Sequence, residues 1–214
     1  MTSSLPAENT TRSVTSPSLR ILACDPARFG DDRTVIGIRQ GRHFRILAKL
    51  RGVDTVETAS RVIAFIKEER PDAVIVDGDG LGAGVVDNIE HRGWGRLLYE
   101  FHGGARSRDP NKYFNRRSEI WGLMADALKA GMEIPDDPEL EVDLCGPQYG
   151  FSNQNQIQLE KKEDSKRRGL ASPDLADTLA MTFAEQIRSR TEGEWYDTLL
   201  RYRYRNDPPD AWLL

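Results

Sequence analysis

Apolar residues follow one another without interruption at two places along the chain. These runs are Ile21-Leu22-Ala23-Cys24 and Ala73-Val74-Ile75-Val76. Unbroken apolar runs of this length are typical of strands that are covered on both faces. We therefore expect a strand at about 20–25 and another that ends near 77, both in the interior of a sheet.

Three further segments are expected to join the same sheet as strands. Residues 33–40 and 43–51 flank the turn Gln40-Gly41-Arg42, and strands joined by so short a turn pair antiparallel. A short strand is expected at about 96–101. Further along, residues 148–151 and 156–159 flank a polar turn and are expected to form a separate β-hairpin.

Helical spacing of apolar residues appears in the segments between the strands. The clearest helix is predicted at about 55–69 and ends at Arg70-Pro71. Its inward positions are Val56, Ala59, Val62, Ile63 and Ile66. A second helix is expected at about 115–131, with Ile120, Leu123, Met124, Ala127 and Leu128 inward. Two more helices are expected at about 82–92 and 173–190.

The order of these elements predicts an α/β architecture. Three antiparallel strands followed by βαβ crossovers give a mixed five-stranded sheet flanked by helices, to which the hairpin is added. This is the strand order of the ribonuclease H-like fold, and we expect it to span residues 19–190. Residues 1–18, rich in Ser, Thr and Pro, are expected to be a flexible leader or linker, and residues 191–214 a C-terminal tail.

Composition narrows the class of protein further. The chain has 214 residues, which suits one domain with extensions, and its net charge of −4 argues against a protein that coats nucleic acid with its whole surface. No apolar run approaches the roughly 18 residues of a membrane helix. Cys24 and Cys145 make neither a disulfide framework nor a zinc site. A cytoplasmic protein that does not contact the membrane is the natural interpretation.

Acidic residues stand where the predicted elements meet. Asp25 and Asp77 end the two apolar runs, and Asp174 and Asp177 lie one turn apart at the start of the last helix. An Asp before Pro26 can simply begin a turn, and Asp is common in the first turn of a helix, here with Ser172 as a candidate N-cap. Carboxylates beside a buried face are costly unless a cation binds, however, so we expect these residues to converge.

The expected cluster favours divalent metal ions that prefer oxygen ligands. With no His or Cys pair in it, the cluster suits Mg²⁺ or Mn²⁺ rather than zinc. We expect Asp25, Asp77 and Asp174 as catalytic ligands, with Asp177 as an adjacent ligand. Two ions about 3.5–4 Å apart can activate water and stabilise the leaving oxygen of a phosphodiester. The four glycines of residues 78–84 would leave room at Asp77, and they do not match an ATP-binding phosphate loop.

Two basic segments are candidates for binding the phosphates of DNA. The first contains Arg106, Arg108, Lys112, Arg116 and Arg117, and the second Lys161, Lys162, Lys166, Arg167 and Arg168. Runs of charge are usually solvated surface. The second segment is favoured, because it directly precedes the helix that carries Asp174.

Three blocks of the sequence resemble the nuclease domain of large terminase subunits of tailed bacteriophages. They span residues 22–34, 76–82 and 157–180, and the last is the most specific. The resemblance implies a ribonuclease H-like endonuclease that cuts concatemeric viral double-stranded DNA during genome packaging by a two-metal mechanism. The metal-binding acids of the family map onto Asp25, Asp77 and Asp174, with Asp177 adjacent.

The resemblance also implies a setting in the cell. Members of the family carry an ATPase motor domain before the nuclease and act with a small terminase subunit and a portal protein in the cytoplasm of an infected bacterial host. This chain has no motor sequence. It is therefore expected to be either an excised domain or a stand-alone relative.

Other functions remain open from the residues. Junction resolvases and transposases use a similar acidic cluster on the same sheet. An actin-like or sugar-kinase-like nucleotide-binding domain would use an Asp-rich first turn and a Gly-rich second turn for phosphates. A catalytically inactive binding domain is the remaining alternative, and the presence of Asp25, Asp77 and Asp174 argues against it.

Overall fold

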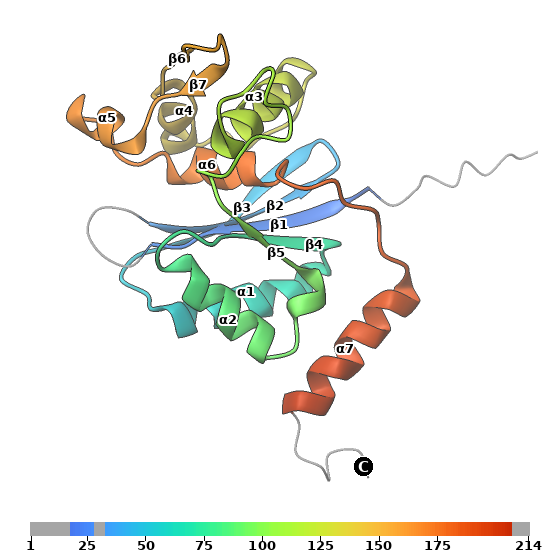
Figure 1. Cartoon of the computed structure of the whole chain (residues 1–214). Coiled ribbons are helices and arrows are strands. Elements are labelled where there is room, and N and C mark those ends of the chain that lie inside the picture. Colours follow the sequence, from blue (N-terminus) through green and yellow to red (C-terminus); the bar gives the residue numbers. More distant parts are fainter. Residues whose placement is uncertain (1–17, 28–32, 207–214) are drawn as a thin grey trace, which may run out of the picture.

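A mixed five-stranded sheet forms the centre of the molecule. The computed structural model describes residues 18–27 and 33–206, and Figure 1 shows the sheet between two layers of helices. Its strands lie in the order β3-β2-β1-β4-β5, with β1 antiparallel to β2 and parallel to β4. The strands are β1 (Arg20–Asp25), β2 (Thr34–Gln40), β3 (His43–Leu50), β4 (Ala73–Asp77) and β5 (Leu98–Phe101). The predicted mixed sheet is confirmed, with β1 in its centre.

One face of the sheet is covered by α1 (Thr55–Glu69) and α2 (Gly82–His91). Alternate residues of β1 point to opposite faces, and Leu22 and Cys24 belong to the core on this side. The Asp54 side chain accepts a hydrogen bond from Glu57 N (2.7 Å) and so begins α1, which ends at Arg70 in the left-handed conformation. The expected boundaries of α1 are confirmed.

The opposite face is covered by α3 (Arg116–Lys129), α4 (Pro138–Cys145) and α6 (Asp174–Met181). Ile21 and Ala23 of β1 belong to the core on this side, together with residues of all three helices. Within the core, Trp121 is buried on α3. Two predicted inward positions are wrong, because Leu123 is 39% exposed and Val56 of α1 is 48% exposed.

The segment that follows α3 is more regular than the sequence suggested. The hairpin is confirmed as β6 (Tyr149–Phe151) and β7 (Ile157–Leu159), but α4 and α5 (Lys162–Arg167) stand where loops were expected. The Asp137 side chain accepts a hydrogen bond from Glu139 N (3.0 Å), and Pro138 occupies the first turn of α4. A short 3-10 helix (Gly95–Leu97) precedes β5.

The predicted helix at 173–190 is wrong in its length. Helix α6 ends at Met181, and the next amides bond three residues back, as in Thr182 N to Leu179 O. Arg39 from β2 explains the end of the helix, because its guanidinium donates to the Oγ1 (3.0 Å) and O (2.7 Å) atoms of Thr182. The carbonyl of Thr182, which would accept a helical hydrogen bond if α6 continued, is therefore bonded to the side chain of Arg39 in strand β2.

A last helix, α7 (Glu192–Asn206), lies within the segment expected to be a tail. Its Trp195, Leu199 and Tyr202 pack against the core on the α1–α2 side, and the ring centroids of Trp94 and Tyr202 are 4.9 Å apart. Residues 1–17 of the expected leader 1–18, the loop 28–32 with Asp31 and Asp32, and residues 207–214 lie outside the described residues. Over the described residues, no helix combines the length and apolarity that crossing a bilayer requires.

Candidate functional site

Asp25 and Asp77 leave the sheet side by side. Cys24 of β1 pairs with Val76 of β4 in parallel register, so the next residue of each strand emerges at the same edge. Asp25 is 7% exposed, and its Oδ2 atom is buried without a hydrogen-bond partner among the described residues. The two strand-ending carboxylates therefore emerge at the same edge of the sheet, and one oxygen of Asp25 has no hydrogen-bond donor among the described residues.

The first turn of α6 brings Asp174 and Asp177 to the same place, both buried. The Oδ2 atom of Asp174 accepts a hydrogen bond from Arg33 N (2.8 Å), which follows the loop after β1. Asp177 accepts one from Trp121 Nε1 (2.7 Å) and pairs with Arg117 Nε (3.2 Å). The helix therefore faces the strand ends with two carboxylates that have different neighbours.

Helix α6 is capped by a residue of α4 rather than by Ser172. The Oδ2 atom of Asp143 accepts a hydrogen bond from Leu175 N (2.9 Å), and Ser172 makes no cap bond. Burial raises the pKa of Asp143 to about 6, and the nearby Asp174 carboxylate adds to this effect. Helix α4 thus helps to fix the position of Asp174.

Burial and neighbouring charges shift the pKa values of these carboxyls in opposite directions. Burial, together with Asp77, Asp177 and Asp174, raises the pKa of Asp25 well above its usual value, although Lys162 opposes this. Burial also raises the pKa of Asp77. Asp177 is as deeply buried, but the positive charges of Lys162 and Arg117 outweigh the effect of burial and lower its pKa.

Lys162, at the start of α5, supplies the positive charge between these groups. Its Nζ atom is 3.0 Å from Asp177 Oδ2 and 3.8 Å from Asp25 Oδ2. Burial lowers its pKa, but Asp25 and Asp177 raise it more, so the ammonium stays charged. With the ammonium there, no three acidic, His or Cys side chains of the described residues surround a common point at metal-binding distance.

The donor set nevertheless suits a hard divalent cation. All four candidate ligands offer carboxylate oxygens, which Mg²⁺ and Mn²⁺ prefer. Asp25 Oδ2 is buried without a hydrogen-bond donor among the described residues, and burial raises the pKa of both Asp25 and Asp77, so a cation at the strand ends would favour their charged forms. Asp25, Asp77 and Asp174 would hold the ion, and Lys162 would have to move away from Asp25.

Glycines allow the turn after Asp77 to fold tightly. A Cβ atom on Gly82 would lie 1.5 Å from Asp77 O, so α2 can begin this close only with glycine at that position. Asp79 N donates to Asp77 Oδ1 (3.0 Å) and thereby orients the carboxylate. His102 Nδ1 lies 2.9 Å from Asp79 Oδ1, which raises the pKa of His102.

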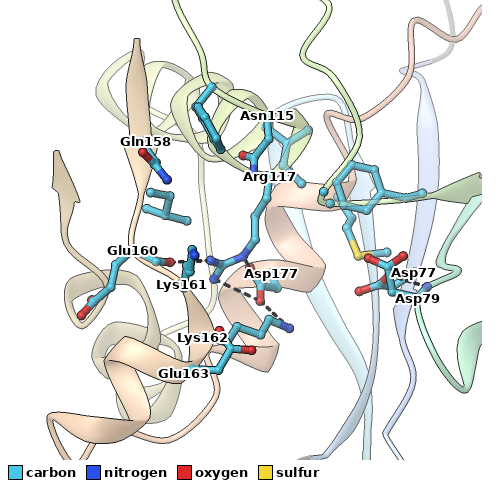
Figure 2. A pocket seen from close by; sticks show the side chains of 17 residues that line it. Asp77, Asp79, Asn115, Arg117, Gln158, Glu160, Lys161, Lys162, Glu163 and Asp177 are labelled. Carbon is cyan, nitrogen blue, oxygen red and sulfur yellow. Dashed lines mark hydrogen bonds and ion pairs between the residues drawn. The ribbon is translucent and has the colours of Figure 1, made fainter. Parts of the chain in front are cut away.

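A cavity of about 380 Å³ opens beside the carboxylates. Asp77 and Asp79 lie at one end and Gln158 and Glu160 at the other, with Arg117 between them (Figure 2). Lys161 and Lys162 also line it. Apolar side chains complete the wall, namely Phe101, Phe114, Ile120, Leu159 and Met181.

The structure separates the predicted DNA-binding residues into two groups. Lys161, Lys162 and Arg117 line the cavity, while Arg106 is exposed away from its lining. Four others pair with carboxylates: Arg108 with Glu185, Lys112 with Asp126, Arg167 with Asp164 and Arg168 with Glu160. Lys166 lies on α5 outside the cavity.

Sequence reasoning missed several residues of the site. Arg117 was grouped only with a basic run, yet it reaches Asp177 from α3. Trp121 and Asp143 support α6 from neighbouring helices, and nothing in their local sequence indicated this contact. Asp79 carried a signal, because it lies within the glycine turn directly after Asp77.

Comparisons with known proteins bear on the fold. No family model and no curated protein matches the sequence. The nuclease domain of the large terminase subunit gp2 of bacterial virus Sf6 is 23% identical with a TM-score of 0.69, over 78% of this chain and 89% of that chain. The large terminase nuclease of thermophilic phage G20c, solved with bound magnesium, is 13% identical with a TM-score of 0.59, over 78% and 82%.

The Sf6 domain has also been solved with manganese and beta-thujaplicinol, at 22% identity and a TM-score of 0.69 over 78% of this chain and 88% of that chain. Structural neighbours of this chain are thus the nuclease domains to which three of its sequence blocks pointed. The resemblance is confirmed at the level of the fold, which is the ribonuclease H-like fold of phage large terminase nuclease domains.

Proposed function

We propose that this protein is a metal-dependent endonuclease that hydrolyses phosphodiester bonds of DNA. The observation that carries the proposal is that three buried carboxylates, Asp25, Asp174 and Asp177, lie with the half-buried Asp77 at two strand ends and one helix start, and that Asp25 Oδ2 has no hydrogen-bond donor among the described residues. Its structural neighbours, nuclease domains that were solved with manganese or magnesium bound, support it.

Asp25, Asp77 and Asp174 would bind one or two Mg²⁺ or Mn²⁺ ions, and Asp177 would act beside them. When bound, such ions activate water and stabilise the leaving oxygen of a phosphodiester. Asp79 N holds Asp77 in place, and Asp143 caps the helix of Asp174. Arg117 and Lys161 provide positive charge along the cavity for the phosphates that flank the scissile bond.

The substrate that this proposal assigns is double-stranded DNA, specifically concatemeric viral DNA during genome packaging. From the resemblance we further propose three partners: an ATPase motor domain, a small terminase subunit and a portal protein. They would act together in the cytoplasm of an infected bacterial host. Motor, subunit and portal would then select where the nuclease cuts, so the chain alone is expected to cut with little sequence preference.

The decisive experiment measures conversion of supercoiled plasmid to nicked and linear forms. We expect cleavage with Mn²⁺ or Mg²⁺, none with EDTA, and none by the Asp77→Asn variant. Asp87→Asn is the matched control, because Asp87 is an exposed carboxylate on α2 outside the cavity. Cleavage that persists in Asp77→Asn, or that disappears equally in Asp87→Asn, would contradict the assignment of the site.

A further inference from the structure

The cavity beside the carboxylates changes its chemistry from one end to the other. Asp77 and Asp79 form an acidic end, and Arg117 and Lys162 lie in the middle (Figure 2). Gln158 lies at the far end together with Glu160, whose charge is paired with Arg168. A phosphodiester backbone needs cations along its path, and the acidic end suits only the phosphate that meets metal ions. Neither requirement explains the apolar and amide groups at the far end.

Phe114 is the most exposed of the aromatic residues that line the cavity. Its side chain is 47% exposed, whereas Phe101 is 6% exposed. The backbone of Phe114 is fixed on both sides, because Phe114 N donates to Ile157 O of β7 (3.0 Å) and Asn115 begins α3. An aromatic ring therefore stands at the rim on a rigid support, close to Gln158 in the neighbouring strand.

An amide side chain, that of Gln158, lines the same cavity as this ring. No described residue forms a hydrogen bond with the Gln158 side chain, which lies at the far end of the cavity (Figure 2). Amide side chains can both donate to and accept from the edge of a nucleobase. An aromatic face with an amide beside it is the combination that proteins use for bases that have left the stack.

The cations lie between the ring and the carboxylates. Arg117 Nη1 donates to Glu160 O (2.9 Å), which holds its guanidinium in the middle of the cavity. A strand that places one phosphate at the carboxylates and its neighbours along Arg117 and Lys161 would bring a nucleoside to Phe114. In a stacked duplex the bases are covered by their neighbours, so only an extruded base can reach the ring.

Resting on the proposed nuclease function, we infer that the cavity binds one unstacked nucleotide of the strand being cut, with its base packed on Phe114. The volume of about 380 Å³ agrees, because it falls in the range of small-molecule sites and is too small for a duplex. The bound substrate is therefore DNA that is locally unpaired near the cut.

The first test measures binding without cleavage. A short fluorescein-labelled oligothymidine is titrated with protein in the Asp77→Asn background, and its anisotropy is recorded in Mg²⁺. We expect Phe114→Ala to raise the dissociation constant about tenfold, because base–aromatic stacking is lost, and Phe114→Trp to preserve binding. Phe151→Ala is the matched control, since Phe151 is 65% exposed on the hairpin but does not line the cavity.

The second test measures cleavage at single-nucleotide resolution on a duplex with one abasic nucleotide. We expect cutting of the bond at one fixed offset from the abasic position to fall about tenfold relative to other bonds of the same molecule. Phe114→Ala should remove this difference. Deleting the ring and deleting the base abolish the same stacking interaction, so the second change has no further effect once the first is made.

The results separate the inference from the proposed function. Phe114-dependent binding without any cleavage would sink the nuclease proposal and retain the base site. Two outcomes would overturn the base site and retain the nuclease. One is metal-dependent cleavage whose rate does not vary with distance from the abasic nucleotide, and the other is oligothymidine binding that Phe114→Ala leaves unchanged. A loss of binding that is as large in Phe151→Ala as in Phe114→Ala would also overturn it.

Discussion

The two faces of the central sheet are built in different ways. On the side of α1 and α2, the core is a continuous apolar cluster that Trp94 and the docked α7 extend. On the side of α3, α4 and α6, an apolar core of similar extent borders on buried charges, among them Asp25, Asp174 and Asp177. One sheet therefore separates a face that only stabilises from a face that also holds reactive groups.

The difference shows how a fold can tolerate buried carboxylates. The pKa values of Asp25 and Asp177 move in opposite directions because Asp177 has Arg117 and Lys162 beside it, while the Oδ2 atom of Asp25 has no donor. The apolar face supplies stability that offsets an unfavourable charge at the strand end. Substitutions on the two faces should then separate stability from activity.

The largest effect is expected for Asp25→Asn. Loss of one metal ligand should lower the nicking rate about a thousandfold, which corresponds to several kcal/mol of lost transition-state stabilisation. A carboxyl whose pKa is raised by folding destabilises the fold at any pH above its ordinary pKa in the unfolded chain, so the metal-free variant should have a higher free energy of unfolding than the wild type at pH 7. Plasmid nicking and urea denaturation in EDTA measure the two effects. A variant that is inactive and also unfolded would contradict the separation of the faces.

On the apolar face, Ile66→Ala should have the opposite profile. Ile66 is completely buried on α1, and truncating it leaves a cavity that should lower the free energy of unfolding by about 2–5 kcal/mol. The nicking rate per folded molecule should stay unchanged, because α1 does not line the cavity. Denaturation curves and nicking assays at low temperature test this, with Val56→Ala as the control, since Val56 is exposed on the same helix.

Arg117→Ala should lower the free energy of unfolding. Asp177 would lose one of its two cations, and breaking a buried ion pair costs about 3 kcal/mol. Adding Asp177→Asn should recover part of the lost stability, because the carboxylate that Arg117 had balanced is removed as well. Denaturation of the two single variants and the double variant measures this coupling. If the change in free energy of unfolding for the double variant equals the sum of the changes for the two single variants, the ion pair does not stabilise the site.

Trp195→Ala should release α7 with little effect elsewhere. The Trp94 and Trp195 ring centroids are 6.2 Å apart, and loss of this contact should cost about 2 kcal/mol of local stability. Faster proteolysis within residues 182–191, at unchanged nicking, is the expected result. Tyr196→Ala provides the control, because Tyr196 is 63% exposed on the same helix.

The smallest effect concerns pH and the start of α7. The Glu194 carboxylate accepts from Thr191 N (2.9 Å) and pairs with Arg188, which lowers its pKa to about 2. Since the pKa is lower in the folded protein than the usual 4.5, this stabilisation exists above pH 4.5 and is lost as the pH falls toward 2. The difference in denaturation midpoint between wild type and Glu194→Gln should shrink over that range. If the difference in denaturation midpoint stayed constant with pH, the charge of Glu194 would have no role in stability.

The sheet and the carboxylates were predictable because their signals are local. Asp25 and Asp77 end unbroken apolar runs, and parallel order places such residues at one edge. The start of α4 also had a local signal, Asp137 followed by Pro138, but only Leu140 and Asp143 of that helix are buried, so its apolar periodicity is weak.

Contacts between distant segments explain what the sequence analysis missed. Arg39 ends α6 from a strand more than a hundred residues earlier in the chain, and Trp121 donates to Asp177 from another helix. Neither contact leaves a mark in the sequence around the residues that it affects. The same holds for Lys162, whose position between two carboxylates depends on the fold of α5 and β1 together.

The parallel pairing of β1 with β4 fixes the distance between the backbone positions of Asp25 and Asp77. Adjacent strands lie about 4.8 Å apart, so the spacing of the two strand-ending carboxylates is inherited from hydrogen bonds between peptide groups rather than from flexible side chains. A slip of β4 by one residue would turn the carboxylate of Asp77 to the other face of the sheet. The site therefore forms only when β1 and β4 pair in the correct register. A chain with the wrong register would have no nuclease activity, rather than cutting DNA indiscriminately.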